Sequence, residues 1–286
     1  MRLSRRATNL LRASVFLGLA FIYVPLIVIG IYAFNKDRIP SFPPDLATLH
    51  WFRVVWSDPN VAPSIRAALG NSLEAAILAT LLALALGSLA AFAIHRYRFF
   101  GREAISFLVI LPIALPGIVT GVALSDTFTQ VLGVDLSLFT VIVGHATFCI
   151  VVVYNNVIAR LRRMSDSIEE ASADLGADPW QTFRYVTFPT MRGALIAGAL
   201  LAFALSFDEI IVTNFTIGAG QETLPIWIFT NLFRPNAVPI VNAVAVITIL
   251  ISVIPVYFAH RLTREEGGAS ARGGVGVPSA EATAVP

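Results

Sequence analysis

The chain has 286 residues, of which 56% are hydrophobic and only 13% are charged, with a mean hydropathy of +0.76. A water-soluble domain carries about 25% charged residues, so this composition excludes an ordinary soluble protein and indicates that lipid is the solvent. The formal net charge of +2 is too small to indicate a nucleic-acid-binding surface. Four scattered histidines and a single cysteine provide no spacing for a metal site and allow no disulfide within the chain.

Six apolar stretches are each long enough to cross a bilayer as a helix of roughly 20 residues. The sequence therefore predicts an all-α, polytopic membrane protein with six transmembrane helices. The first stretch is too long for the apolar region of a signal peptide and lacks a cleavage site of small residues, so we expect it to be retained. The predicted spans are residues 13–34, 69–94, 104–124, 138–158, 194–215 and 238–258.

The basic residues are unevenly distributed between the predicted loops, and this bias predicts the orientation of the chain. With the N-terminus inside, the cytoplasmic segments hold most of the 20 lysines and arginines. Both termini are therefore expected in the cytoplasm. The outer segments hold only Lys36, Arg38, Arg53, Arg66 and Arg234.

These spans divide the chain into three parts. A cytoplasmic N-terminus at residues 1–12 precedes a six-helix transmembrane domain at residues 13–262, which includes a cytoplasmic loop at 165–189. Residues 263–286 are rich in Gly, Ala, Ser and Pro and are predicted to form a disordered cytoplasmic tail. Pro112 and Pro116 are expected to interrupt the third span, as a packing kink more than as part of a passage.

The 165–189 loop is polar and has a helical pattern that is broken in the middle. Ser167 and Glu170 have the spacing of a capping box at the start of a first short helix. Gly176 favours the left-handed backbone conformation that commonly ends a helix. The sequence therefore predicts a first helix that ends in a sharp turn.

A second short helix is predicted directly after that turn. Asp178 has the position of an N-cap, Pro179 that of the first helical residue, and Pro189 lies near the expected end. Gln181 completes a second capping box with Asp178. The helix carries an aromatic and apolar load that is unusual for a loop in water, so we expect a protein partner or, alternatively, the lipid headgroups to cover it. These side chains are Trp180, Phe183, Tyr185 and Val186.

The same loop resembles the signature loop of the permease subunits of bacterial ABC importers. That pattern is Glu-Ala-Ala, three residues, Gly, nine residues and Ile-x-Leu-Pro, and this chain keeps its spacing from Glu170 to Pro189. Ser172, Val186 and Phe188 depart from it with small or apolar replacements. The resemblance implies that the loop docks into a cytoplasmic ATPase subunit through Glu170, Ala171, Gly176, Trp180, Phe183 and Pro189.

The resemblance also implies a complex in a bacterial inner membrane. Its other parts are a second permease subunit, two ATPase subunits that bind ATP and Mg, and an extracytoplasmic solute-binding protein. This chain is expected to hold no cofactor, metal or catalytic site of its own. The phosphate-binding motif Gly-x4-Gly-Lys-Ser/Thr requires a lysine, and the one lysine of the sequence, Lys36, lies in a predicted outer loop.

Two adjacent acids lie inside the fifth predicted span, where charge is costly and is usually functional. On a continuous helix Ser206, Glu209 and Thr213 share one face, and Asp208 points about 100° away from Glu209. We therefore expect Asp208 or Glu209 to line a passage for a small cationic solute. A structural ion pair or hydrogen bond with a neighbouring helix is the alternative.

Four short motifs resemble the spermidine/putrescine branch of these permeases, in particular its second membrane subunit, and the likeness covers nearly all of residues 11–262. Polyamines are polyvalent cations with apolar spacers, so carboxylates and aromatic residues such as Trp227 suit them. Related branches import other small organic solutes, which leaves a different substrate open. The motifs are Ser206-Phe207-Asp208-Glu209, Thr216-Ile217-Gly218, Thr223-Leu224-Pro225 and Val241-Asn242-Ala243.

Two other classes of function compete with an ABC importer subunit. A proton-coupled secondary transporter would use Asp208 or Glu209 as its proton carrier, although the sequence has no internal repeat of the kind found in many such proteins. A membrane enzyme would need convergent catalytic residues near one interface, and the sequence offers none.

Overall fold

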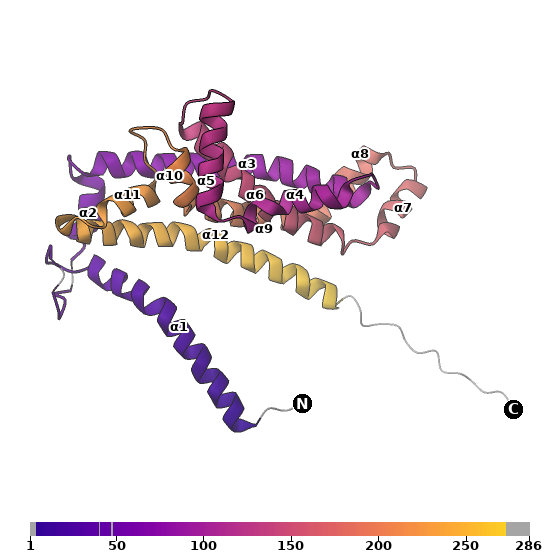
Figure 1. The fold of residues 1–286 in the computed structure, drawn as a ribbon. Helices are drawn as coiled ribbons and strands as arrows, with labels where there is room; N and C mark the ends of the chain where they lie inside the picture. Colours follow the sequence, from indigo (N-terminus) through magenta and orange to yellow (C-terminus); the bar gives the residue numbers. More distant parts are fainter. Residues whose placement is uncertain (1–3, 40, 47, 273–286) are drawn as a thin grey trace. The chain divides into compact units, whose positions relative to one another are not determined.

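The computed structural model describes residues 4–39, 41–46 and 48–272, and most of them are helical. Figure 1 shows the helices in chain order. In the described part of the chain the only extended pairing is an isolated bridge between Asn35 and Leu46, so the all-α prediction is confirmed. The helices are α1 (Arg5–Ala33), α2 (His50–Ser57), α3 (Ala62–Arg96), α4 (Arg102–Ala114), α5 (Gly117–Asp126), α6 (Leu138–Leu161), α7 (Asp166–Asp174), α8 (Pro179–Thr182), α9 (Phe188–Phe207), α10 (Ile211–Thr216), α11 (Leu224–Asn231) and α12 (Val238–Arg272).

Shorter helical segments join some of these helices. Two π-helical turns, η1 (Thr127–Val131) and η2 (Phe183–Thr187), follow α5 and α8, and a 3₁₀ turn, η3 (Pro235–Ala237), precedes α12. Among the described residues, five helices are long and apolar enough to cross a membrane: α1, α3, α6, the helix that runs through α8 and α9, and α12. The pair of α4 with α5 and η1 makes a sixth span if the two halves are counted together. Each predicted span therefore corresponds to one of these elements.

The third span is broken between α4 and α5, where the two halves are bent by 107°. Leu115 has an extended backbone, with φ −82° and ψ 142°, because the ring of the following Pro116 disfavours helical backbone at the residue before it. Pro112, in contrast, lies inside α4 without ending it. The predicted interruption is therefore present, and it is a complete break at Pro116.

The chain divides into two compact units, which alternate along the sequence. The first unit comprises the chain up to Ala75 with Gly121–Val141 and Asp208–Ser252, and the second comprises Ala76–Thr120, Ile142–Phe207 and the chain from Val253 onward. The connections predicted to lie outside all belong to the first unit, and those between spans predicted to lie inside all belong to the second. The boundaries between the units fall within or beside α3, α5, α6, α9 and α12.

Within the second unit, small residues allow α3, α6 and α9 to pack closely. A Cβ atom on Gly87 would lie 2.9 Å from the carbonyl oxygen of Ile150, so this approach of α3 to α6 requires glycine. The α6 helix is the most buried of the candidate spans. Its His145 Nδ1 lies 2.7 Å from the Ser206 hydroxyl of α9, and both side chains are buried.

The first helix has a different environment from the other spans. The apolar window of α1 is 0% buried within the chain, and Ala33 at its end is the one buried residue among those that the structure describes in it. Leu10, Phe16 and Phe21 are among its exposed apolar side chains. An apolar helix without cover from its own chain faces lipid or another subunit.

The fifth predicted span has different boundaries in the structure. Its helix starts much earlier, since α8, η2 and α9 form one continuous helix of 29 residues from Pro179 to Phe207. It also ends earlier, at Phe207, and α10 is a separate helix of six residues. The prediction of one helix over residues 194–215 is therefore wrong, and so is the prediction that a separate loop helix ends near Pro189.

The continuity through Pro189 has a physical explanation. Proline has no N–H to donate, and inside an α-helix its ring collides with the carbonyl four residues earlier. Directly before it the chain widens into the π-helical turn η2, in which the Phe188 N–H donates to the Phe183 oxygen five residues back. We infer that the wider turn gives the ring of Pro189 the space it needs, so the helix continues.

The C-terminal helix is also longer than the predicted span. Helix α12 extends to Arg272, so the first part of the predicted disordered tail is helical. The remainder of that tail, residues 273–286, lies outside the described residues.

Candidate functional site

Helix α7 of the 165–189 loop ends at a left-handed glycine, as the sequence predicts. Gly176 has φ +84°, a conformation in which a side chain is strained. Its N–H donates to the Ala173 oxygen at 2.9 Å, and the Ala177 N–H donates to the Ser172 oxygen at 3.1 Å. This pair of bonds is a Schellman motif, which satisfies the last carbonyls of α7 and reverses the chain.

The start of α7 differs from the prediction. The helix begins at Asp166 with Ser165 as its N-cap residue, and no side chain makes a capping bond there. Ser167 is already inside the first turn, so the predicted capping box of Ser167 and Glu170 is wrong. Instead, the hydroxyls of Ser165 and Ser167 form a hydrogen bond with each other, with their oxygens 2.6 Å apart.

Helix α8 begins with the predicted capping box. The Asp178 carboxylate accepts hydrogen bonds from the N–H groups of Trp180 at 2.8 Å and Gln181 at 2.9 Å. The Gln181 side-chain oxygen accepts from the Asp178 N–H at 2.9 Å. Pro179 occupies the first helical position, as predicted. The turn between α7 and α8 is thus fixed by residues within a few positions of one another.

The acid that anchors the loop is Glu169, not Glu170. One Glu169 oxygen accepts from the Thr187 hydroxyl at 2.7 Å, and the other lies 3.1 Å from the Arg96 guanidinium at the end of α3. Glu170 is exposed, and so is Ala171. A second link joins the Ser172 and Thr182 hydroxyls at 3.0 Å.

The aromatic residues of the loop fall into two groups. Phe183 is half-buried, with its ring centroid 5.8 Å from that of Phe92 in α3 and 6.1 Å from that of Phe188. Trp180 stacks on Phe183 at 5.7 Å yet remains 65% exposed, and Tyr185 is 71% exposed. With Leu175, which is 90% exposed, they leave apolar surface uncovered on the loop. Phe183 therefore packs against α3 with part of its surface, and its contact with a partner stays a prediction.

The acidic pair lies at a helix end, not inside a helix. Asp208 is exposed and follows the last residue of α9. The Glu209 carboxylate accepts the Val212 N–H at 2.8 Å, and the Glu209 carbonyl accepts the Thr213 hydroxyl at 2.8 Å. Because the helix breaks here, the predicted shared face of Ser206, Glu209 and Thr213 is wrong. Ser206 belongs to α9 and lies beside His145.

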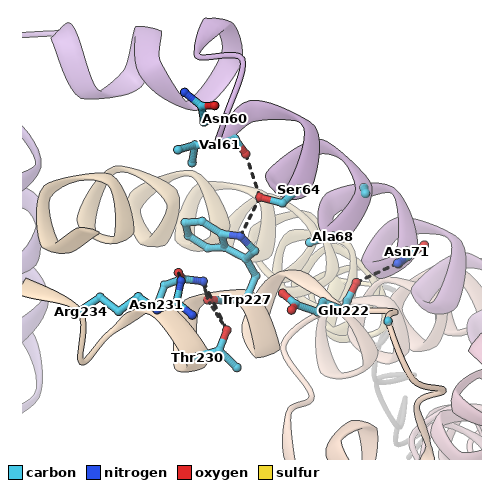
Figure 2. Close-up of a pocket in the computed structure, with 12 residues that line it drawn as sticks. Asn60, Val61, Ser64, Ala68, Asn71, Glu222, Trp227, Thr230, Asn231 and Arg234 are labelled. Atoms are coloured by element: carbon cyan, nitrogen blue, oxygen red, sulfur yellow. Dashed lines mark hydrogen bonds between the residues drawn. The ribbon is translucent and has the colours of Figure 1, made fainter. Parts of the chain in front are cut away.

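Trp227 lines a cavity of about 540 Å³ in the first unit, between the start of α3 and the region of α11 (Figure 2). Its indole is only 5% exposed, and its N–H donates to the Ser64 hydroxyl at 3.1 Å. Asn71 and Glu222 lie on the wall of the cavity, and so does Arg234, whose positive charge is opposite in sign to that of Glu222. The volume falls within the range of small-molecule sites, about 300–1,000 Å³.

Two side chains of α3 hold the wall of this cavity in place. The Asn71 amide donates to the Glu222 carbonyl at 2.8 Å, and the Ser72 hydroxyl accepts the Leu224 N–H at 2.8 Å. The Ser72 bond satisfies one of the free N–H groups at the start of α11. The 217–223 segment is fixed at its other side by Thr140, whose hydroxyl donates to the Thr216 carbonyl at 2.6 Å.

Comparison with known families decides the class of the protein. The family described as binding-protein-dependent transport system inner membrane component matches residues 83–265, well over half of the chain. The chain belongs to this family. It is therefore a multi-pass transport subunit of an inner membrane, as the hydropathy and the loop motif predict.

Two relatives of this permease have names that state a substrate. The spermidine/putrescine transport system permease protein PotC of Haemophilus influenzae is 32% identical over 88% of this chain and 96% of its own length. The putrescine transport system permease protein PotI of Escherichia coli strain K12 is 34% identical over 80% and 82% of the two chains. The resemblance to the spermidine/putrescine branch is therefore confirmed.

A solved structure confirms the fold. A chain of a bacterial ABC transporter involved in the import of the acidic polysaccharide alginate superimposes with a TM-score of 0.61, covering 93% of this permease and 99% of that chain at 20% identity. The fold is thus that of an ABC importer permease. Since that fold serves a solute with acidic groups, the fold by itself carries no information on the charge of the solute carried here.

The roles of Glu169 and Glu222 were not predicted from the sequence. Glu169 has no signal that separates it from Glu170, and its role appears only when α3 and α7 are placed together. Glu222 lies in a polar connection, and its position beside Asn71 depends on a contact across 151 residues. The sequence patterns used for prediction cover a few turns of chain, so contacts of this range lie beyond them.

Proposed function

We propose that this permease forms half of the translocation pathway of an ATP-driven importer and is driven by a separate ATPase subunit that binds ATP and Mg. The observation that carries the proposal is the unbroken helix from Pro179 to Phe207. It joins the exposed apolar side chains of the 165–189 loop directly to a membrane span. A displacement of α8 is therefore passed to α9, since a helix is a rigid element and a flexible loop is not.

We infer the surface of the loop that binds the ATPase from the exposed side chains within the loop. Ala171, Leu175, Trp180 and Tyr185 are exposed and apolar or aromatic, and exposed apolar surface of this kind marks protein contacts. Gly176 sets the turn between the two helices, and Glu169 ties the loop to α3. We infer that Glu170 provides a charged contact at the rim of this surface, and that Phe183 and Pro189 position α8 relative to the spans.

The cytoplasmic location of the loop rests on the charge bias of the sequence. Arginines are concentrated in the segments of the second unit, where Arg96, Arg98, Arg102, Arg160, Arg162 and Arg163 flank the spans. By the positive-inside rule the connections between spans in the second unit and both termini are cytoplasmic, and the connections between spans in the first unit are outside.

The solute we propose is a polyamine, such as putrescine or spermidine. The two relatives described above carry these substrates in their names, and this chain carries two adjacent carboxylates, Asp208 and Glu209, directly after α9. Asp208 is exposed, and in the described part of the chain no hydrogen bond or ion pair occupies its carboxylate. Glu209 uses one oxygen as a cap, so Asp208 is the better candidate for contact with the cation.

The complex requires further subunits. We propose a second permease subunit, against which the uncovered α1 packs, together with two ATPase subunits. The family description names a binding-protein-dependent system, and we propose an extracytoplasmic binding protein that delivers the solute to the outer connections of the first unit.

The deciding experiment reconstitutes the permease with its partner permease and ATPase in proteoliposomes. The binding protein and labelled putrescine are added outside the vesicles, and the ATPase subunits face the interior. We expect uptake that requires ATP in the compartment of the ATPase and is insensitive to a protonophore. An ATPase variant without its phosphate-binding lysine is the control, and it should give no uptake. Uptake that persists without ATP and collapses with the protonophore would instead establish the proton-coupled alternative. Robust ATP-driven uptake of a different organic solute, with none of putrescine or spermidine, would overturn the polyamine assignment alone.

A further inference from the structure

The donors that line the cavity around Trp227 are largely used inside the protein (Figure 2). The Trp227 indole N–H donates to Ser64, and the Ser64 hydroxyl donates in turn to the Val61 carbonyl at 2.9 Å. The Asn71 amide N–H donates to the Glu222 carbonyl at 2.8 Å. These groups have no further hydrogen to offer to a ligand, apart from the second hydrogen of the Asn71 amide.

The same holds for the wall formed by the end of α11. The Thr230 hydroxyl donates to the Trp227 carbonyl at 3.1 Å, and the Asn231 amide donates to that carbonyl at 2.8 Å. The Asn231 amide also donates to the Thr230 hydroxyl at 3.3 Å, so the donors of both residues are used within the last turn of α11.

Apart from the neutral amides of Asn60 and Asn71 and the Arg234 guanidinium, the side-chain groups on the wall that remain free are acceptors. Among the described residues, none donates a hydrogen bond or forms an ion pair with the Glu222 carboxylate, and none donates to the side-chain oxygen of Asn71. Figure 2 shows Glu222 between Trp227 and Asn71. A carboxylate, an amide oxygen and an indole next to one another suit a ligand that is positively charged and rich in hydrogen-bond donors.

We propose that this cavity is a binding site for a primary alkylammonium group. The Glu222 carboxylate serves as the counter-ion, the Asn71 oxygen accepts a second N–H, and the Trp227 indole forms the wall along which the alkyl chain lies. An ammonium group has three N–H donors and no acceptor, which complements this set. The inference rests on the proposed function, and it deepens it by placing a contact with the cation on the first unit, in a cavity that is separate from Asp208.

Arg234 differs from the other free donors on the wall because it carries a positive charge. One of its guanidinium N–H groups donates to the Asn231 oxygen at 3.1 Å, and its others are free to meet a ligand. In Figure 2 it lies on the opposite side of Trp227 from Glu222. A fixed positive charge in the same cavity weakens the binding of a cation, so Arg234 limits the affinity of the site and favours release. This produces a signature that a purely structural role would not: removal of the two charges should change affinity in opposite directions.

The ammonium group can come from two sources. It is either one end of a free diamine or the end of a lysine side chain on the binding protein that docks to the outer connections of the first unit. Both present the same chemistry to Glu222, and they are separated by whether the binding protein has to be present.

The test uses the assembled transporter in nanodiscs. Binding of labelled putrescine is measured without the binding protein, and association of the solute-free binding protein is measured separately. The variants are Glu222→Gln, which keeps the shape and the backbone contact with Asn71, and Arg234→Gln. Asp135→Asn is the matched control, because Asp135 is an exposed carboxylate of the same unit that does not line the cavity.

If the site takes a free amine, Glu222→Gln should weaken putrescine binding roughly tenfold, Arg234→Gln should strengthen it, and Asp135→Asn should leave it unchanged. If the site takes a lysine of the binding protein, the same opposite changes should appear in the association of that protein and not in putrescine binding. Unchanged values for Glu222→Gln in both measurements, in a complex that imports putrescine normally, would overturn the inference and leave the proposed function intact. A wild-type complex that imports no polyamine would overturn the proposed function itself.

Discussion

The 165–189 loop contains the start of the helix Pro179–Phe207, and the 208–237 segment follows the end of that helix. The contacts that fix these two regions differ in their range along the chain. In the loop, the Gly176 turn and the Asp178 cap are formed by residues that lie within five positions of one another. In the segment, Glu222 and Thr216 are fixed by Asn71 and Thr140, which are 151 and 76 residues away along the chain. The turn within the loop is therefore set locally, while Glu169 ties the loop as a whole to α3. The segment, in contrast, takes its shape from the spans.

This difference fits two tasks. An element that receives a displacement from a partner should keep its own form while it moves, and local capping bonds provide that. An element that admits or releases a solute should change when the spans move, and bonds to distant spans make it follow them. We therefore expect variants in the loop to act on coupling, and variants in the segment to act on the solute.

The largest effect is expected from Gly176→Val. A β-branched residue at φ +84° is strained by about 1–2 kcal/mol even though no atom beyond the adjacent residues lies within 4 Å of the added Cβ. The turn should open, and α8 should lose its position relative to α7. We expect ATP-driven uptake to fall to background in proteoliposomes while the amount of protein in the membrane stays the same.

The control for this variant is Gly176→Asn. Asparagine tolerates the left-handed conformation better than other residues with a side chain, so it should retain a substantial part of the uptake. Equal loss in both variants would show that the surface at Gly176, and not its backbone conformation, carries the effect. Normal uptake by Gly176→Val would contradict the coupling role of the turn.

The next effect separates the two groups of aromatic residues in the loop. Trp180→Ala removes a side chain that is 65% exposed, and truncation of a tryptophan at the centre of an interface commonly costs about 2 kcal/mol or more of binding. We expect the ATPase to bind the permease pair about thirtyfold more weakly in a titration in detergent. The thermal stability of the permease pair should fall less than in Phe183→Ala, because Trp180 loses one ring contact and Phe183 loses three.

Phe183→Ala is the matched comparison. Its ring contacts Phe92 and Phe188, and aromatic pairs contribute about 0.5–1.5 kcal/mol each. This variant should therefore lower the unfolding temperature of the permease pair before any ATPase is added. If Trp180→Ala destabilised the protein as much as Phe183→Ala, the division of the loop into an outward and an inward group would be wrong.

The third effect concerns the segment. Asp208→Asn removes an exposed carboxylate, and contact between a charged group and a hydrogen-bonding partner contributes about 1.5–3 kcal/mol. We expect the uptake of labelled putrescine at low concentration to fall about tenfold. Glu209→Gln should have a smaller effect, because glutamine keeps an oxygen that can accept the Val212 N–H.

ATP hydrolysis by the assembled complex supplies the control for both variants. It should remain stimulated by the loaded binding protein, since the 165–189 loop is untouched. Normal uptake in both variants would remove the acidic pair from the solute pathway and favour the structural role of Glu209 as a cap.

The features that were predictable from the sequence follow from the same difference. Hydropathy located the six spans because each crossing needs a fixed length of apolar chain. The Gly176 turn and the Asp178 cap were predictable because each depends on residue types a few positions apart. The break after Phe207 was not, since residues 194–215 are mainly apolar and contain neither glycine nor proline at the break. At Pro189 the sequence predicted a helix end that the structure does not have, because a π-helical turn compensates for a proline that usually ends a helix.

The smallest effect is expected from the caps, and it tests how far the form of the loop is local. Asp178→Ala removes the oxygen that accepts the Trp180 and Gln181 N–H groups, and loss of an N-cap commonly costs about 1 kcal/mol. Ser165→Ala is the matched control, because Ser165 has the N-cap position of α7 without a side-chain capping bond. Amide hydrogen exchange of the loop in the permease pair measures both: α8 should exchange about fivefold faster in Asp178→Ala and at the wild-type rate in Ser165→Ala. Faster exchange in α7 of the Asp178→Ala variant as well would show that the two helices open together. In that case the loop would behave as one cooperative unit, and its contacts through Glu169 would contribute more to its form than the local caps do.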